Sequence, residues 1–155
     1  MDWTGAAEHA GLLEFTRGLA ELRRAHPVFR RRRFFTGPAD IGWLTPAGTP
    51  MTGPDWSADF AKSLAVFLPG DAIGEPGPRG EPVKDDSFLL MFNAAEHDVE
   101  FTVPAAGDSA HWVQELDTAD PAALPAGAVT TVKPGDALTV ASRSMRLLRR
   151  VVTPL

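Results

Sequence analysis

An amphipathic helix that ends at a proline is the feature that most constrains this chain. Five residues recur at alternating spacings of three and four, which places them on one stripe of an α-helix: Leu12, Phe15, Leu19, Leu22 and His26. Pro27 cannot donate a backbone hydrogen bond and favours extended geometry at His26, so we expect the helix to end near Ala25. The rest of the chain must supply an apolar surface for this stripe or leave it open.

The sequence after residue 35 predicts short strands separated by turns. The strongest strand is SFLLMFN at 87–93, which we expect to be central and to form a hairpin with the alternating segment 99–103. Residues 63–68 are apolar throughout, as in a strand buried on both faces. With further short strands, this pattern predicts a mainly β fold, an antiparallel β-sandwich preceded by one amphipathic α-helix.

Four segments carry a resemblance to a known family. They are LLEFTRGLAELRRAHPVFRRRRFF, DIGWL, MTGPDW and SLAVFLPGDAIGEPGPRGEPVKDDSFLLMFNA, in this order along the chain. Together they resemble the C-terminal region of bacterial glycogen debranching enzymes of the isoamylase type, in glycoside hydrolase family 13. The resemblance covers nearly the whole chain but only the C-terminal part of such an enzyme. Gly18 departs from the family pattern, in which a longer side chain is usual.

The resemblance implies a division of the chain. Residues 1–35 would be the last helix of a (β/α)8 barrel with a basic arm, and residues 36–155 the C-terminal β-sandwich domain of the α-amylase superfamily. It also implies a parent glycosidase that hydrolyses α-1,6-glucosidic branch linkages with two carboxylates on its barrel. None of the family's catalytic motifs lies in this chain, so we expect it to be structural and non-catalytic. The alternative is a stand-alone carbohydrate-binding or oligomerising β-sandwich module.

Composition and charge exclude several other classes. The chain has no Cys, and its four His lack the spacing of a metal site, so we expect no metal and no cofactor. Residues 1–35 carry seven Arg against four acidic residues, whereas the remainder is strongly acidic, which argues against nucleic-acid binding. No apolar run approaches the roughly 20 residues that cross a bilayer, and no secretory signal is present, so we expect no membrane contact and a cytoplasmic location.

Two pairs of side chains are candidates for chemistry. Trp43 and Trp56 could stack on sugar rings, giving a weak α-glucan contact, although core packing is the favoured interpretation for both and for Trp112. Asp85 and Asp86 are adjacent, so on a strand they would point to opposite faces and could not easily flank one scissile bond. We interpret them as residues that cap a turn before the central strand.

The helix stripe and the basic arm are candidate contact surfaces. We expect the stripe of Leu12, Phe15, Leu19 and Leu22 to contact the upstream barrel of the parent enzyme, or a second copy of this chain if the barrel is absent. The run Arg30 to Arg33 is interpreted as an exposed arm that pairs with the acidic body or with a missing neighbour domain. The long loop at 69–86, rich in Pro and Gly, is predicted to be the most mobile internal segment.

Overall fold

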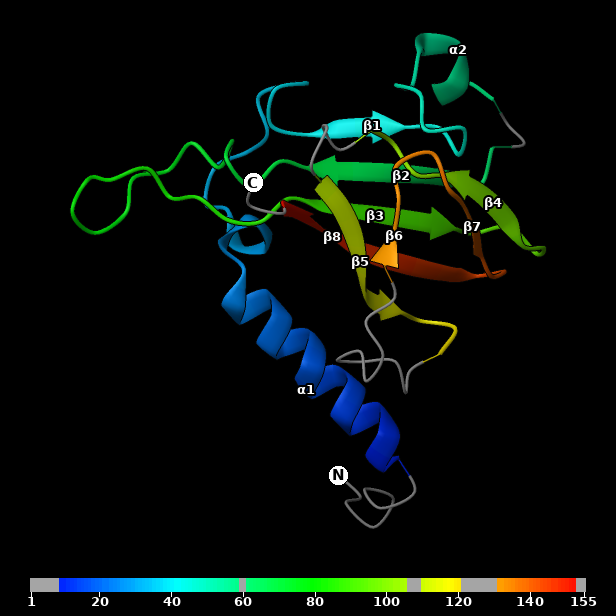
Figure 1. Ribbon diagram of the computed structural model, residues 1–155, viewed down its shortest axis with the longest axis horizontal. Coiled ribbons are helices and arrows are strands. Elements are labelled where there is room, and N and C mark those ends of the chain that lie inside the picture. Colours follow the sequence, from blue (N-terminus) through cyan, green and yellow to red (C-terminus); the bar gives the residue numbers. More distant parts are fainter. Residues whose placement is uncertain (1–8, 59–60, 106–109, 121–130, 153–155) are drawn as a thin grey trace.

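The computed structural model describes residues 9–58, 61–105, 110–120 and 131–152 (Figure 1). The helical elements are α1 (Ala10–Ala25), the 3-10 helix η2 (Pro27–Arg30) and α2 (Gly53–Trp56). The strands are β1 (Gly42–Leu44), β2 (Ser63–Leu68), β3 (Phe88–Asn93), β4 (Val99–Thr102), β5 (Ala110–Asp117), β6 (Thr131–Val132), β7 (Ala137–Val140) and β8 (Ser144–Val152).

These strands form two antiparallel sheets. The larger sheet has the order β1-β2-β3-β8-β5-β6, and the smaller one pairs β4 with β7. A core cluster between them joins Met91 and Trp112 of the large sheet to Phe101 and Val140 of the small one, each at most 1% exposed. The chain is therefore mainly β, an antiparallel sandwich preceded by one amphipathic helix, as predicted. Because β3 pairs with β2 on one side and β8 on the other, its central position is also confirmed.

The opposite face of the large sheet carries a second apolar cluster. Its strand residues include Val66, Phe88 and Leu147, and Val28 and Ile73 cover them from outside the sheet. Three residues of α1 pack against this cluster and remain half-buried: Phe15, Leu19 and Leu22. Burial on both faces explains why β2 and β3 read as continuous apolar runs.

The hairpin predicted between segments 87–93 and 99–103 is wrong. Both edges of β3 are occupied by β2 and β8, so β4 pairs with β7 in the other sheet. The side chain of Asn93 stabilises this change of sheet, since its Nδ2 donates to the carbonyl oxygens of His97 and Val140 and its Oδ1 accepts the Ala95 N–H. A buried amide with so many partners fixes the chain where it leaves β3.

The segment after α1 also differs from expectation. The helix ends at Ala25, as predicted, but Pro27 begins a 3-10 turn instead of an extended arm. Proline suits the first position of such a turn because its missing N–H would have had no partner there. Val28 then enters the second core cluster and is 2% exposed.

Among the described residues, no helix is long and apolar enough to cross a membrane.

Candidate functional site

Trp43 and Trp56 form an exposed aromatic pair. Their ring centroids are 5.4 Å apart and their planes meet at 73°, with the edge of one ring toward the face of the other. Trp43 is 41% exposed and Trp56 is 54% exposed, whereas Trp112 is 1% exposed. Core packing, the favoured interpretation from sequence, therefore holds for Trp112 and is wrong for the other two.

Regular backbone structure holds both rings in place. Trp43 lies in β1, opposite Val66 of β2, and its carbonyl oxygen accepts the Met51 N–H at 2.9 Å. Trp56 ends α2, where the N–H and hydroxyl of Thr52 both donate to Asp55 Oδ2, at 2.7 and 2.6 Å. These two bonds from Thr52 lower the pKa of the Asp55 carboxyl. Thr52 and Asp55 thus form a capping box at the start of α2.

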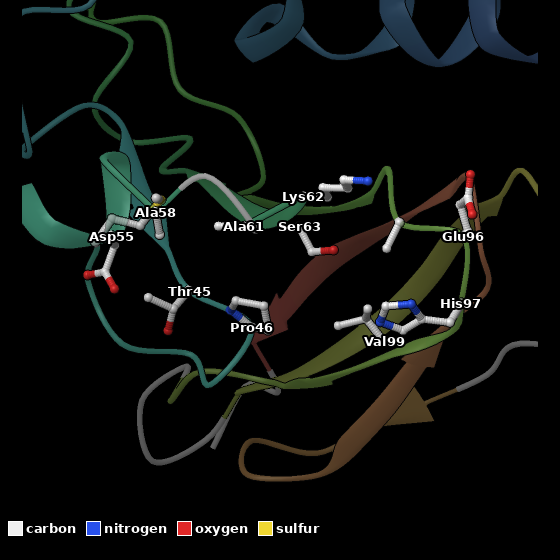
Figure 2. A pocket seen from close by; sticks show the side chains of 12 residues that line it. Thr45, Pro46, Asp55, Ala58, Ala61, Lys62, Ser63, Glu96, His97 and Val99 are labelled. Atoms are coloured by element: carbon white, nitrogen blue, oxygen red, sulfur yellow. The ribbon is translucent and has the colours of Figure 1, made fainter.

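A hollow of about 740 Å³ adjoins α2 at one end of the sandwich. Figure 2 shows Asp55 on one side of it and Glu96 and His97 on the other, with Lys62 above. Asp55 Oδ2 accepts both bonds from Thr52, and Glu96 lies 3.3 Å from Arg143. Small and apolar side chains make up most of the remaining wall. The described lining therefore does not provide the two carboxylates that a glycosidase places on either side of the scissile bond.

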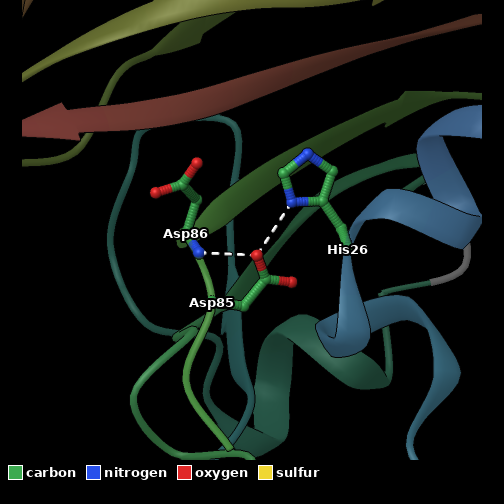
Figure 3. Close-up of side chains that lie close together, drawn as sticks. All are labelled: His26, Asp85 and Asp86. Carbon is green, nitrogen blue, oxygen red and sulfur yellow. Dashed lines mark hydrogen bonds and ion pairs between the residues drawn. The ribbon is translucent and has the colours of Figure 1, made fainter.

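A second polar cluster lies where α1 meets the sheet. His26, Asp85 and Asp86 offer potential ligand atoms within 4.8 Å of one another (Figure 3). However, Asp85 Oδ1 already faces His26 Nδ1 at 2.8 Å and accepts the Asp86 N–H, while its Oδ2 accepts the Val28 N–H at 2.9 Å. Asp86 is oriented toward Arg149 instead. Asp85 thus acts as a structural acceptor for η2, and the turn-capping role expected for Asp85 and Asp86 before β3 is not what the described contacts show, since Asp86 pairs with Arg149.

The basic arm is tied to the body through a buried ion pair. Arg31 lies 3.0 Å from the carboxylate of Asp40, and both side chains are buried. The same guanidinium donates to the carbonyl oxygens of Ala72 and Ile73 in the long loop. The expected pairing of the arm with the acidic body is confirmed at this position, but Arg31 itself is not exposed.

The helix stripe is covered unevenly. Phe15, Leu19 and Leu22 contact the second core cluster, whereas Leu12 is 65% exposed and its neighbour Leu13 is 53% exposed. The sandwich therefore covers the C-terminal part of the stripe and leaves its N-terminal part open.

Sequence reasoning missed Asp40 and Asp85 as structural centres. Asp85 contacts His26 across 59 positions of sequence, a separation that no local pattern encodes. Asp40 had a nearby signal, because a side chain three or four residues after Thr36 and Gly37 can accept their N–H groups, and it does. The structure does not bring Trp43 or Trp56 together with the helix stripe.

Comparison with known proteins identifies what this sandwich is similar to. Residues 40–151 match the family described as "Isoamylase, C-terminal". The chain is 47% identical over 161 residues to a protein of Mycobacterium tuberculosis (strain ATCC 25618 / H37Rv) named "Glycogen operon protein GlgX homolog", covering 98% of this chain and 22% of that relative. The Mycobacterium bovis protein of the same name gives the same values.

A more distant relative comes from Pectobacterium carotovorum subsp. carotovorum and is named "Glycogen debranching enzyme". It is 27% identical over 113 residues, covering 72% of this chain and 14% of the relative. The chain thus spans less than a quarter of the length of the curated relatives that it matches.

Proposed function

This chain belongs to the isoamylase C-terminal family, and we propose that it serves a larger debranching glycosidase as a bracing domain. It matches the C-terminal region of isoamylase-type debranching enzymes, and its relatives extend far beyond the matched segment. The proposed parent activity is hydrolysis of α-1,6-glucosidic branch linkages in glycogen. The chain itself would take part without supplying the catalytic carboxylates.

The uneven cover of α1 is the observation that carries the bracing role. A helix that packs Phe15, Leu19 and Leu22 against the sandwich and leaves its N-terminal leucines in solvent is suited to contact two bodies at once. Each leucine contributes roughly 1.5–3 kcal/mol when it is fully buried. In the proposed assembly the upstream catalytic barrel covers them, and the sandwich holds the helix in position from the other side.

This assignment supports the division of the chain into residues 1–35 and 36–155. The family match begins at residue 40, just after the arm that links η2 to β1. Residues 1–35 would then connect the barrel to the sandwich, since Val28 and Arg31 of this segment also contact the sandwich. A cytoplasmic location is part of the same proposal.

A chimera tests the bracing function directly. The C-terminal segment of the Mycobacterium tuberculosis relative would be replaced by this chain, and release of linear chains from a glycogen limit dextrin would be measured. We expect the chimera to debranch, whereas the 155-residue chain alone should release nothing. A Leu12→Asp, Leu13→Asp chimera should lose activity or heat stability, and a matched Arg17→Asp chimera should retain both.

Two outcomes would contradict the proposal. The first is hydrolysis by the chain alone that disappears when one of its own acids is changed. The second is a folded chimera whose activity and heat stability are the same with and without the leucine changes, because α1 would then not contact the barrel.

Self-association is a second candidate role for the same helix. In the absence of a barrel, two copies could bury their open stripes against each other around a two-fold axis. The stripe consists of Leu12, Phe15, Leu19 and Leu22. Its exposed N-terminal end favours this arrangement.

A further inference from the structure

We propose that Trp43 and Trp56 form a binding platform for a curved α-1,4-linked glucan chain. The inference rests on the proposed function, since it takes glycogen as the polymer near this domain, and it adds the residues and the linkage geometry. The platform is separate from the α1 surface proposed above to contact the barrel.

The exposure of the two rings is the first support. Indole rings are the side chains that gain most from burial, yet these two keep 41% and 54% of their surface in solvent. They contact each other, and neither belongs to a described core cluster. A pyranose ring presents a flat apolar face of C–H groups, which can cover an indole while its hydroxyls stay in water.

The angle between the rings selects the kind of chain. A β-1,4-linked glucan is extended and nearly flat, so it can lie on one ring plane but not on two that meet at 73°. An α-1,4-linked glucan turns at every linkage. Consecutive glucose units of such a chain can therefore face two differently inclined ring surfaces.

The rings are preorganised. Strand pairing and the Met51 N–H hold the backbone of Trp43, and the Thr52–Asp55 capping box holds the turn that carries Trp56. Binding would therefore cost little ordering of the protein.

Polar groups in the segments that carry the rings can accept hydrogen bonds from sugar hydroxyls. Asp55 Oδ2 takes both bonds from Thr52, and no other described residue occupies its Oδ1. The lowered pKa of this carboxyl keeps it ionised near neutral pH. On the β1 side, the hydroxyls of Thr45 and Thr49 lie 2.9 Å apart in an exposed turn.

Nuclear magnetic resonance of the indole N–H groups provides the test. The chain has four Trp, and their side-chain signals can be assigned with Trp→Phe variants. Titration with maltoheptaose should shift the signals of Trp43 and Trp56 with a millimolar dissociation constant, and should leave buried Trp112 unchanged. Cellohexaose, the β-1,4 counterpart, should not shift both rings together, because it can lie on only one of the two ring planes.

Variants assign the effect to the pair. Trp43→Ala and Trp56→Ala should each weaken maltoheptaose binding about fivefold or more, by analogy with the loss of one stacked base. Phe34→Ala, which removes an aromatic ring that is 95% exposed elsewhere, should not change it. Unchanged backbone spectra away from the substitutions would show that each variant is folded.

The outcomes are separable from those of the proposed function. Absence of shifts at both indoles, or equal shifts with cellohexaose, overturns the platform even if the chimera debranches. If instead a Trp43→Ala, Trp56→Ala double variant weakens the stability of the chimera while maltoheptaose shifts neither ring, the pair is a contact between domains and the platform is wrong. Sugar-dependent shifts in a chain whose chimera is inactive would sustain the platform and remove only the bracing role.

Discussion

His26 Nδ1 lies 2.8 Å from Asp85 Oδ1, and this contact joins the end of α1 to the last residues of the loop before β3 (Figure 3). The imidazole also packs edge-to-face against Phe88, with ring centroids 4.7 Å apart. Since Asp85 accepts the Val28 N–H as well, one carboxylate holds α1, η2 and the start of β3 together. The direction in which α1 leaves the sandwich, and hence the surface it offers, depends on this residue.

Replacing Asp85 with Ala should lower the free energy of unfolding by about 1–3 kcal/mol, because the Val28 N–H would lose its partner in a nearly buried position. Asp86→Ala is the matched control. Its side chain is about half exposed and its ion pair with Arg149 is worth roughly 0–1 kcal/mol. Urea denaturation of both variants checks this, and equal losses would show that Asp85 does not fix the junction.

The ion pair of Arg31 and Asp40 should make stability depend on pH in the acid range. Burial alone would raise the pKa of the Asp40 carboxyl, but the N–H groups of Thr36 and Gly37 and the charge of Arg31 outweigh it and hold the pKa below its ordinary value of 3.8. The stabilisation is therefore complete above 3.8 and is lost as the pH falls through the lower folded value.

An Asp40→Asn variant isolates that contribution. The gap in free energy of unfolding between the two proteins should be widest at neutral pH and should narrow as the solution is acidified below the ordinary pKa of the carboxyl. Urea titrations at a series of pH values measure the gap. A constant gap across the series would mean that the charge of Asp40 contributes nothing.

Trypsin should cut the long loop at Arg79 before Lys84. The loop extends away from the sheets (Figure 1). Lys84 lies at the base of the loop, between two residues that bond across it: the Val83 N–H donates to the Glu75 carbonyl oxygen, and the Asp85 N–H donates to that of Gly70. Arg79 occupies the exposed tip. Limited proteolysis followed by mass spectrometry gives the order of cleavage, and early cutting at Lys84 would show that the base opens as readily as the tip.

The sequence predicted mobility for the whole segment 69–86, but the structure shows that parts of this segment are anchored to the body. Ile73 is buried in the second core cluster, and Arg31 binds the carbonyl oxygens beside it. A Cβ on Gly70 would collide with the backbone oxygen atoms of Asp85 and Asp86, so glycine allows the two ends of the loop to approach. Composition revealed the length of the loop but not these anchors.

Features of the fold that depend on local signals could be predicted from the sequence, whereas features that depend on long-range contacts could not. The end of α1 could be predicted from Pro27, because it depends on neighbours within a few residues. The start of α2 has a local signal of the same kind in Thr52 and Asp55. The partner of β4 depends on which strand edges are already filled, and the exposure of Trp43 depends on its place at the edge of the sheet. Neither property has a local signature.

The open N-terminal end of α1 should make the isolated chain self-associate. Leu12 and Leu13 are exposed, whereas Phe15 and Leu19 are held against the sandwich, so a second copy has most to gain at the N-terminal end of the helix. Changing Phe15 and Leu19 to Asp would also loosen the helix from the sandwich. A Leu12→Asp, Leu13→Asp variant instead tests association while leaving the contacts of Phe15 and Leu19 with the sandwich in place.

Light scattering over a range of protein concentration should give a larger mass for the original chain than for this variant. Arg17→Asp, which adds acidic charge at an exposed position on another side of the helix, should associate like the original. Burial of each leucine in a pair would contribute roughly 1.5–3 kcal/mol to the free energy of association. Because association also costs translational and rotational freedom, several residues of the stripe must contribute for two copies to stay together. If the original chain is monomeric at every concentration and α1 is protected in hydrogen exchange, the sandwich alone satisfies the helix and self-association is wrong.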